Sequence, residues 1–295
     1  MNAIPSVFAI TSTVNSTWCS GAGFSWDSGT STCTLSTSYT VNSGDVLVIP
    51  NPVSGYVTLN VASGGSITIL SAGELENDGV FQILAGGSGS NSGKISDDGT
   101  FMNEGTFTSG GTITVTDTFS NDGTFTSSGT IDSISPAIST SSGTFVNSGT
   151  IKGDGFSSDG TLTNSGTITI GTTGPACLCL EGGVLTNLAS GSIEIYGDIF
   201  NFATIDNYGT ITANPGSNIT NFYSGTINDL CGGTLVIDQG ATFTQQPGSI
   251  FTTQPYCSAP GVPQFPVAAT GPLLLTALLL PLLLLTRRKA RNLTL

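Results

Sequence analysis

Apolar residues recur every six positions in the middle of the chain, and this spacing limits the fold more than any other feature. The repeated positions are Ile95, Phe101, Phe107, Ile113, Phe119, Phe125 and Ile131. Six is a multiple of two, the side-chain period of a strand, whereas along a helix of 3.6 residues per turn these residues would rotate around the axis. The spacing therefore predicts short stacked strands that each turn one large side chain inward.

A short unit, Asn-x-Gly-Thr-Ile/Phe, accompanies these positions. We expect its Gly to supply a positive φ at a tight corner, its Thr to favour a strand and its Ile or Phe to fill a core. We also expect the Asn side chains to stack between successive turns as a ladder of amide hydrogen bonds. These residues are Asn77, Asn91, Asn103, Asn121, Asn147, Asn164 and Asn207. One unit buries one apolar side chain, so only many stacked units make a continuous core.

The repeat predicts an all-β fold, a parallel β-solenoid over residues 39–244 with roughly ten turns. Residues 1–38 are expected to form an N-terminal segment and cap. Irregular gaps, such as that from Ile131 to Phe145, favour a right-handed β-helix, whereas three hexads per turn would suit the left-handed form. Disorder is the alternative for so Ser-, Thr- and Gly-rich a chain, but the 38% hydrophobic content and the regular spacing argue against it.

The C-terminal region predicts a membrane anchor. Residues 267–286 carry no charge and are rich in Leu, and a helix of about 20 residues spans the hydrocarbon core of a bilayer. Residues 245–266 contain five prolines, which favours an extended stalk. The tail, 287–295, carries a basic cluster that places it in the cytoplasm by the positive-inside rule. This cluster consists of Arg287, Arg288, Lys289 and Arg291.

Two resemblances extend these expectations. The sequence VPQFP at 262–266, the apolar span and the basic cluster together resemble the C-terminal sorting signals of archaeal surface proteins, whose short motif commonly reads Pro-Glu-Phe. The resemblance implies a sorting protease as a partner, although the chain departs from the motif at Gln264, and both a retained anchor and cleavage stay open. The repeat resembles β-solenoid adhesins and surface-layer-like proteins of bacteria and archaea over roughly 40–240. That resemblance implies a role at the cell surface.

Several features predict that the body is exported. The chain has six cysteines, an even number typical of disulfide-bonded extracellular proteins. Asn15 and Asn218 begin Asn-x-Ser/Thr sequons and are candidate glycosylation sites. Residues 1–40 contain no Lys or Arg and so do not match a secretory signal. We therefore expect either a misassigned start codon or an incomplete chain.

The cysteine spacing predicts two disulfides. Cys19 and Cys33 bracket a short loop just before the repeat, where a disulfide would staple a cap over the first turn. Cys231 and Cys257 would tie the stalk to the last turns. The remaining pair, Cys177 and Cys179, is too close in sequence to join easily across an extended strand. Free, strained and intermolecular states all stay open for it.

Charge and composition exclude several function classes. Histidine is absent, which rules out imidazole chemistry, and all 19 acidic residues but only Lys94 and Lys152 precede residue 287. Such an acidic body would repel nucleic acid and anionic lipid, so we expect no nucleic-acid partner. Acidic corners could bind Ca²⁺, but neither an EF-hand loop nor the Gly-Gly-x-Gly-x-Asp repeat occurs. We predict no metal site and no cofactor.

An enzyme is the alternative from a different class. A secreted, glycan-active β-helix enzyme would need paired carboxylates, and the formal candidates are Asp97 with Asp98 and Asp117 with Asp122. Adjacent residues of a strand point to opposite faces, and Asp before Gly is explained by corner chemistry alone. The sequence therefore predicts no catalytic residues.

Together these features predict a structural or adhesin-like protein of the cell surface that displays a rigid β-solenoid on a membrane anchor. We expect a single-pass protein of the cell membrane with an extracellular solenoid and a cytoplasmic C-terminus, or a processed, envelope-attached form. Glycans or other cell-surface proteins are the expected contacts.

Overall fold

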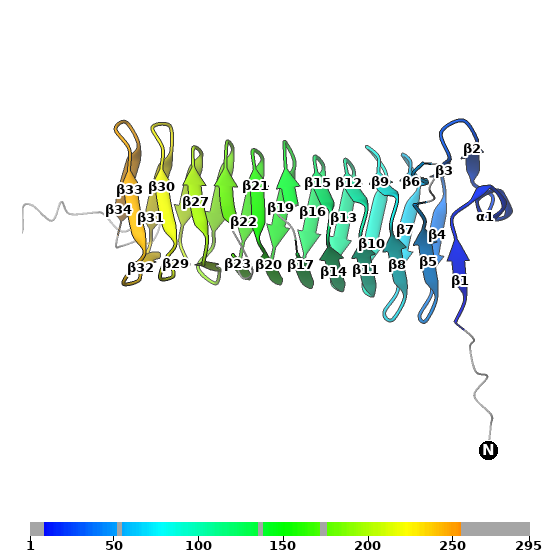
Figure 1. Cartoon of the computed structure of the whole chain (residues 1–295), viewed down its shortest axis with the longest axis horizontal. Coiled ribbons are helices and arrows are strands. Elements are labelled where there is room, and N and C mark those ends of the chain that lie inside the picture. Colours follow the sequence, from blue (N-terminus) through cyan, green and yellow to red (C-terminus); the bar gives the residue numbers. More distant parts are fainter. Residues whose placement is uncertain (1–8, 52–54, 135–137, 172–175, 255–295) are drawn as a thin grey trace, which may run out of the picture. The chain divides into compact units, whose positions relative to one another are not determined.

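The computed structural model describes residues 9–51, 55–134, 138–171 and 176–254, and these residues form an all-β, parallel β-solenoid. From β3 (Thr32–Leu35) onward, successive strands belong to three different sheets in turn, so each strand pairs in parallel with the third strand after it (Figure 1). Strand β2 (Ser25–Asp27) instead pairs with β3 in the antiparallel direction. The three sheets contain 11, 12 and 11 strands and are called sheets A, B and C. The handedness of the coil stays a prediction.

Sheet A consists of β1 (Thr11–Thr13), β5 (Val46–Ile49), β8 (Glu74–Asn77), β11 (Lys94–Asp97), β14 (Thr112–Val115), β17 (Thr130–Ser133), β20 (Thr150–Gly153), β23 (Thr167–Ile170), β26 (Ser192–Ile195), β29 (Thr210–Ala213) and β32 (Thr234–Ile237). Sheet B consists of β2 (Ser25–Asp27), β3 (Thr32–Leu35), β6 (Thr58–Val61), β9 (Val80–Ile83), β12 (Thr100–Asn103), β15 (Thr118–Asn121), β18 (Ile138–Thr140), β21 (Gly155–Ser158), β24 (Cys177–Leu180), β27 (Asp198–Asn201), β30 (Asn218–Asn221) and β33 (Thr242–Gln245). Sheet C consists of β4 (Ser38–Val41), β7 (Ser66–Ile69), β10 (Ser88–Asn91), β13 (Thr106–Ser109), β16 (Thr124–Ser127), β19 (Thr144–Asn147), β22 (Thr161–Asn164), β25 (Val184–Asn187), β28 (Thr204–Asn207), β31 (Thr226–Leu230) and β34 (Ile250–Gln254).

Most strands are four residues long, and their second and fourth side chains point into the coil. The register keeps like residues on top of one another, for example Phe101 beside Phe119 and Phe107 beside Phe125. The rings of Phe107 and Phe125 are stacked, with centroids 5.5 Å apart. Such aromatic pairs add about 0.5–1.5 kcal/mol beyond the area they bury. The six-residue period therefore becomes an apolar core that runs along the coil.

Buried Asn side chains occupy the last position of many strands and form the amide ladder that the spacing predicts. Asn147 donates to Asn164 with an Nδ2–Oδ1 distance of 2.8 Å, and Asn164 donates in turn to Asn187 at 2.9 Å. Asn187 continues the series to Asn207 at 2.8 Å. The Asn147 amide also donates to the backbone carbonyl of Thr167. These bonds satisfy polar groups that would otherwise be buried without partners.

The repeat glycines are required for a different reason from the one the sequence predicts. The prediction of a positive φ is wrong at Gly93, Gly99, Gly105 and Gly111, which do not adopt that conformation. Instead, the corners stack so closely that a Cβ at Gly111 would lie 2.1 Å from the carbonyl oxygen of Gly93, one turn earlier. The requirement is a close approach of backbone to backbone, which only a residue without Cβ allows.

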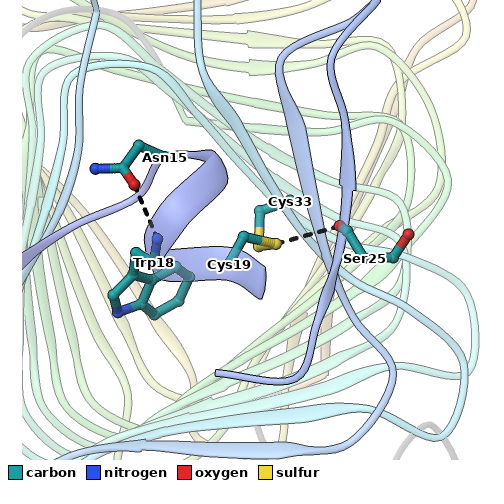
Figure 2. The surroundings of a disulfide bond; sticks show 5 residues. All are labelled: Asn15, Trp18, Cys19, Ser25 and Cys33. Carbon is teal, nitrogen blue, oxygen red and sulfur yellow. Dashed lines mark hydrogen bonds between the residues drawn. A yellow bond between two sulfur atoms is a disulfide. The ribbon is translucent and has the colours of Figure 1, made fainter. Parts of the chain in front are cut away.

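A short helix and a disulfide lie at the N-terminal end of the coil. Helix α1 (Ser16–Gly21) begins after Asn15, whose Oδ1 accepts a hydrogen bond from Trp18 N at 2.8 Å (Figure 2). Cys19 and Cys33 are joined with their Cα atoms 5.8 Å apart, and both side chains are fully buried. The disulfide therefore fastens α1 to β3 over the first apolar layer.

The ladder extends beyond the predicted range of 39–244 at both ends. Strands β1 and β3 lie in the predicted N-terminal segment, yet they pair in parallel with β5 and β6. Strand β34 lies in the segment predicted as a stalk and pairs with β31 over five residues. The rest of the stalk, the predicted span at 267–286 and the basic tail lie outside the described residues. Among the residues that are described, no helix has the length and apolar character needed to cross a membrane.

Candidate functional site

The first carboxylate pair predicted from the sequence is split between the inside and the outside of the coil. Asp97 ends β11 and is completely buried, whereas Asp98 follows it on the exposed corner and accepts a hydrogen bond from Thr116 Oγ1. The expectation that the two side chains point in opposite directions agrees with this arrangement. A substrate outside the coil could therefore meet Asp98 but not Asp97.

Asp97 occupies the last position of its strand and lies next to Asn77, which has the same position one turn earlier. Its Oδ1 accepts a hydrogen bond from Asn77 Nδ2 at 2.5 Å, while its Oδ2 has no partner among the described residues. The pKa of this carboxyl is raised from 3.8 to about 8, chiefly because burial removes the hydration of the charged form, with smaller contributions from the charges of Asp117 and Asp98. The hydrogen bond from Asn77 lowers the pKa only in part. A protonated Asp97 is uncharged and has the same shape as an Asn side chain.

The second predicted pair, Asp117 and Asp122, lies on exposed corners. Asp122 Oδ1 accepts a hydrogen bond from the backbone N–H of Ser142 at 3.3 Å, one turn away. This is the corner role that the sequence assigns to Asp before Gly. No group of three or more Cys, Asp or Glu side chains within the described part of the chain is arranged to hold a metal ion.

The two sequon asparagines take different places. Asn15 is exposed and caps α1 through its side-chain oxygen. Asn218 is exposed on the outer face of β30, where its Nδ2 donates to Asp198 Oδ1 at 2.8 Å. A glycan on Asn218 Nδ2 would compete with that hydrogen bond, whereas the Asn15 Nδ2 is not used by the cap.

The cysteines form two disulfides among the described residues. The structure joins Cys19 to Cys33, the pair that the sequence predicts first. It also joins Cys177 to Cys179 within β24. The sequence left free, strained and intermolecular states open for this pair, and in the structure the two cysteines are neither free nor bonded to another molecule. The second predicted pair, Cys231 with Cys257, cannot be followed because Cys257 lies outside the described residues.

A shallow hollow with a volume of about 390 Å³ lies on the outer face of sheet A. Its lining consists of Lys152, Thr169, Gly171, Glu194 and Tyr196. None of these residues was predicted from the sequence as a site residue. This set is called the sheet A hollow below.

The hollow results from the register of three neighbouring strands. Lys152 on β20 is the register partner of Thr169 on β23, which is the partner of Glu194 on β26. Neighbouring strands lie about 4.8 Å apart, so β20 and β26 lie about 10 Å apart. The long side chains of Lys152 and Glu194 therefore flank the short side chain of Thr169. Next to them, Gly171 lies opposite Tyr196, whose backbone N–H donates to Ile170 O. Thr169 and Gly171 therefore form the floor, and the three larger side chains form the rim.

The rim combines an aromatic surface with polar groups of both signs. The Tyr196 side chain is 50% exposed and can cover an apolar face of a ligand, while its hydroxyl can form hydrogen bonds. Lys152 can donate and Glu194 can accept. In contrast to Lys94, whose Nζ is paired with Glu74 at 2.5 Å, Lys152 has no ion-pair partner within the described residues. A concave surface with a few converging polar groups is the usual form of a small-ligand site.

Sequence reasoning missed the hollow because its residues are separated by irregular gaps along the chain. One signal was present, since Lys152 is one of only two cationic residues before the basic tail. The position of Lys152 beside Thr169 and Glu194 depends on strand register, which the repeat spacing did not fix in this region.

No protein-family model matches the chain, and no curated protein matches it. Among solved structures, the crystal structure of the TibC-catalysed, hyper-glycosylated fragment of TibA is similar over 74% of this chain and 97% of that chain. The sequence identity is 19% and the TM-score is 0.21. At these values the similarity carries no argument about function.

Proposed function

We propose that this protein is an adhesin-like protein of the cell surface, in which the β-solenoid is a rigid scaffold and the sheet A hollow is a contact site for a neutral glycan. The solenoid is presented outside the cell by the predicted stalk and membrane anchor, or by an envelope attachment after cleavage at the sorting-signal-like tail. The export features of the sequence and the two disulfides support this location.

The single observation that carries the proposal is the alignment of Lys152, Thr169 and Glu194 beside Tyr196. A sugar has apolar C–H faces and several hydroxyls, so it needs an aromatic surface with donors and acceptors at its edge. The rim supplies one cation and one carboxylate, which together favour a neutral ligand. An anionic polysaccharide would be repelled by the rest of the acidic body.

Location is tested on intact cells that express the full chain. Membrane-impermeant biotin reagents or added protease should reach the solenoid and spare a short tail beyond residue 286. A solenoid that is protected in intact cells and is digested only after lysis would contradict the surface location.

Binding is tested on an array of immobilised neutral glycans. Tyr196→Ala should weaken binding at least tenfold, because it removes the aromatic wall of the hollow, whereas Tyr56→Ala is a matched control at another exposed tyrosine. Lys152→Met should also weaken binding. Equal loss in the Tyr196 and Tyr56 variants, or no binding of the unmodified protein to any neutral glycan, would refute the proposed contact site.

The alternative, a glycan-active enzyme, is tested in the same experiment. The bound glycans are recovered and their chain lengths are measured by mass spectrometry. We expect unchanged lengths after prolonged incubation. Glycans shortened by the unmodified protein and by Asp97→Asn, but not by Asp98→Asn, would support the enzyme and overturn a purely adhesive role.

A further inference from the structure

The disulfide between Cys177 and Cys179 lies on the outer surface of sheet B. The two cysteines are the first and third residues of β24, and both are partly exposed. The alternate residues Leu178 and Leu180 point inward, and each is only 1% exposed. A disulfide at these positions is open to reagents in solution, whereas Cys19 and Cys33 are fully buried.

This disulfide contributes little to the stability of the fold. A disulfide stabilises a protein mainly by closing a loop in the unfolded chain, and the effect decreases as the loop shortens. Cys177 and Cys179 are separated by two positions, compared with 14 for Cys19 and Cys33. Strand β24 is already held by parallel ladders to β21 and β27 on its two sides. The fold therefore does not depend on this bond.

The neighbouring strands give the two sulfur atoms different surroundings. Cys177 is the register partner of Asp198, whereas Cys179 is the partner of Phe200. The carboxylate of Asp198 repels a thiolate that approaches Cys177, so we take Cys179 as the sulfur that is attacked. The same carboxylate disfavours a lasting thiolate at Cys177, so the leaving sulfur is protonated soon after the bond breaks. The Phe200 ring lies 6.1 Å from that of Phe222, so an aromatic surface begins next to the Cys179 sulfur.

We propose that Cys177–Cys179 is a thiol-exchange site that captures a cysteine of a partner protein, with apolar residues flanking that cysteine. The partner thiolate attacks Cys179 Sγ and forms a new S–S bond. The bond between Cys177 and Cys179 breaks, and Cys177 leaves as a thiolate that takes a proton from water. One disulfide replaces another and one thiol replaces another, so no external oxidant or reductant is consumed.

Exchange is first tested with reduced glutathione on the full, oxidised chain. The reaction is quenched with N-ethylmaleimide, and the digested protein is analysed by mass spectrometry without reduction. We expect adducts or alkylation at Cys177 and Cys179 at least tenfold faster than at Cys19 and Cys33. If Cys19–Cys33 opens equally fast or first, or if Cys177 and Cys179 in the isolated protein are not joined to each other, the proposal is overturned.

A variant separates exchange from folding. The double variant Cys177→Ser, Cys179→Ser should melt at the temperature of the unmodified protein and form no adduct. A decrease in melting temperature as large as that of Cys19→Ser, Cys33→Ser would show that the disulfide is structural, and would refute the proposal. The expected result does not depend on the glycan site, because the hollow lies on sheet A and the disulfide on sheet B.

The preferred partner is tested with two peptides that each contain one Cys, flanked either by Leu and Phe or by Asp and Ser. The apolar peptide should form its mixed disulfide several-fold faster. Phe200→Ala should remove most of that difference, while Phe243→Ala, at a partly buried ring on β33, is the control. Equal rates for the two peptides with the unmodified protein would contradict the proposed partner class.

Discussion

Replacement of Asp97 with Asn should remove a strong pH dependence from the unfolding of the solenoid. In the folded chain the carboxyl is completely buried and its pKa is raised to about 8, against an ordinary value of 3.8. Asn has the same shape and is uncharged, and it occupies the equivalent position one turn earlier at Asn77. The substitution therefore removes the titration while it preserves the ladder.

The sign follows from proton binding. Between pH 4 and pH 8 the folded state keeps a proton on Asp97 that the unfolded state has released, so the free energy of unfolding falls as pH rises. The slope is about 1.4 kcal/mol per pH unit, which gives a loss of about 5 kcal/mol over this range. Below pH 4 the contribution is complete, and above pH 8 no further loss occurs. Asp97→Asn should lack this loss.

The measurement is urea or thermal unfolding followed by circular dichroism at pH 4 to 9. The difference in stability between Asp97→Asn and the unmodified protein should grow steadily with pH, because all other titrating groups are shared. Asp132→Asn is the matched control, since Asp132 is exposed on the outer face of β17. Parallel pH profiles for Asp97→Asn and the unmodified protein would refute the assignment of a buried, protonated carboxyl.

Three further substitutions test the packing of the coil by thermal unfolding. Gly111→Ala should lower stability by about 1–3 kcal/mol because its Cβ would overlap a backbone carbonyl. Gly110→Ala should be nearly neutral, because its Cβ would make only ordinary van der Waals contacts; equal effects would contradict the close stacking of corners. Phe107→Asp should cost several kcal/mol by burying an unpaired carboxylate, while the outward-facing Thr108 should tolerate Asp; unchanged β-type circular dichroism and melting in both would exclude a packed core. Asn164→Ala should cost about 1–3 kcal/mol, because it leaves buried amides without partners; a neutral result would show that the ladder contributes no stability.

Much of the fold could be predicted from the sequence because its determinants are local. The side-chain period of a strand is two, so residues spaced by six or a multiple of six, such as Phe101, Phe107 and Phe119, point to the same side of the coil. This does not depend on contacts made elsewhere in the chain. Asn at the end of a strand meets its counterpart one turn away because every turn repeats the same backbone path. The buried pair of Cys19 and Cys33 also followed from the spacing, since the loop between them is short.

The glycine corners show where local reasoning stops. The sequence predicts glycine at the corners correctly but gives the wrong reason, because a φ value is a property of one residue, whereas the contact between Gly111 and Gly93 exists only when two turns stack. The same holds for Asp97, since its residue type cannot show that it is buried and hydrogen-bonded to Asn77 one turn away.

The sequence by itself determined the kind of fold, the inward-facing residues and the acidic character of the body. Only the tertiary structure decided which outward residues meet: the alignment of Lys152, Thr169 and Glu194, and the position of Cys179 beside Phe200. The physical reason is that inward positions are fixed by the alternation within each strand, whereas outward neighbours belong to different turns. Their pairing depends on the number of residues in every corner between them, and those corners vary in length along the chain.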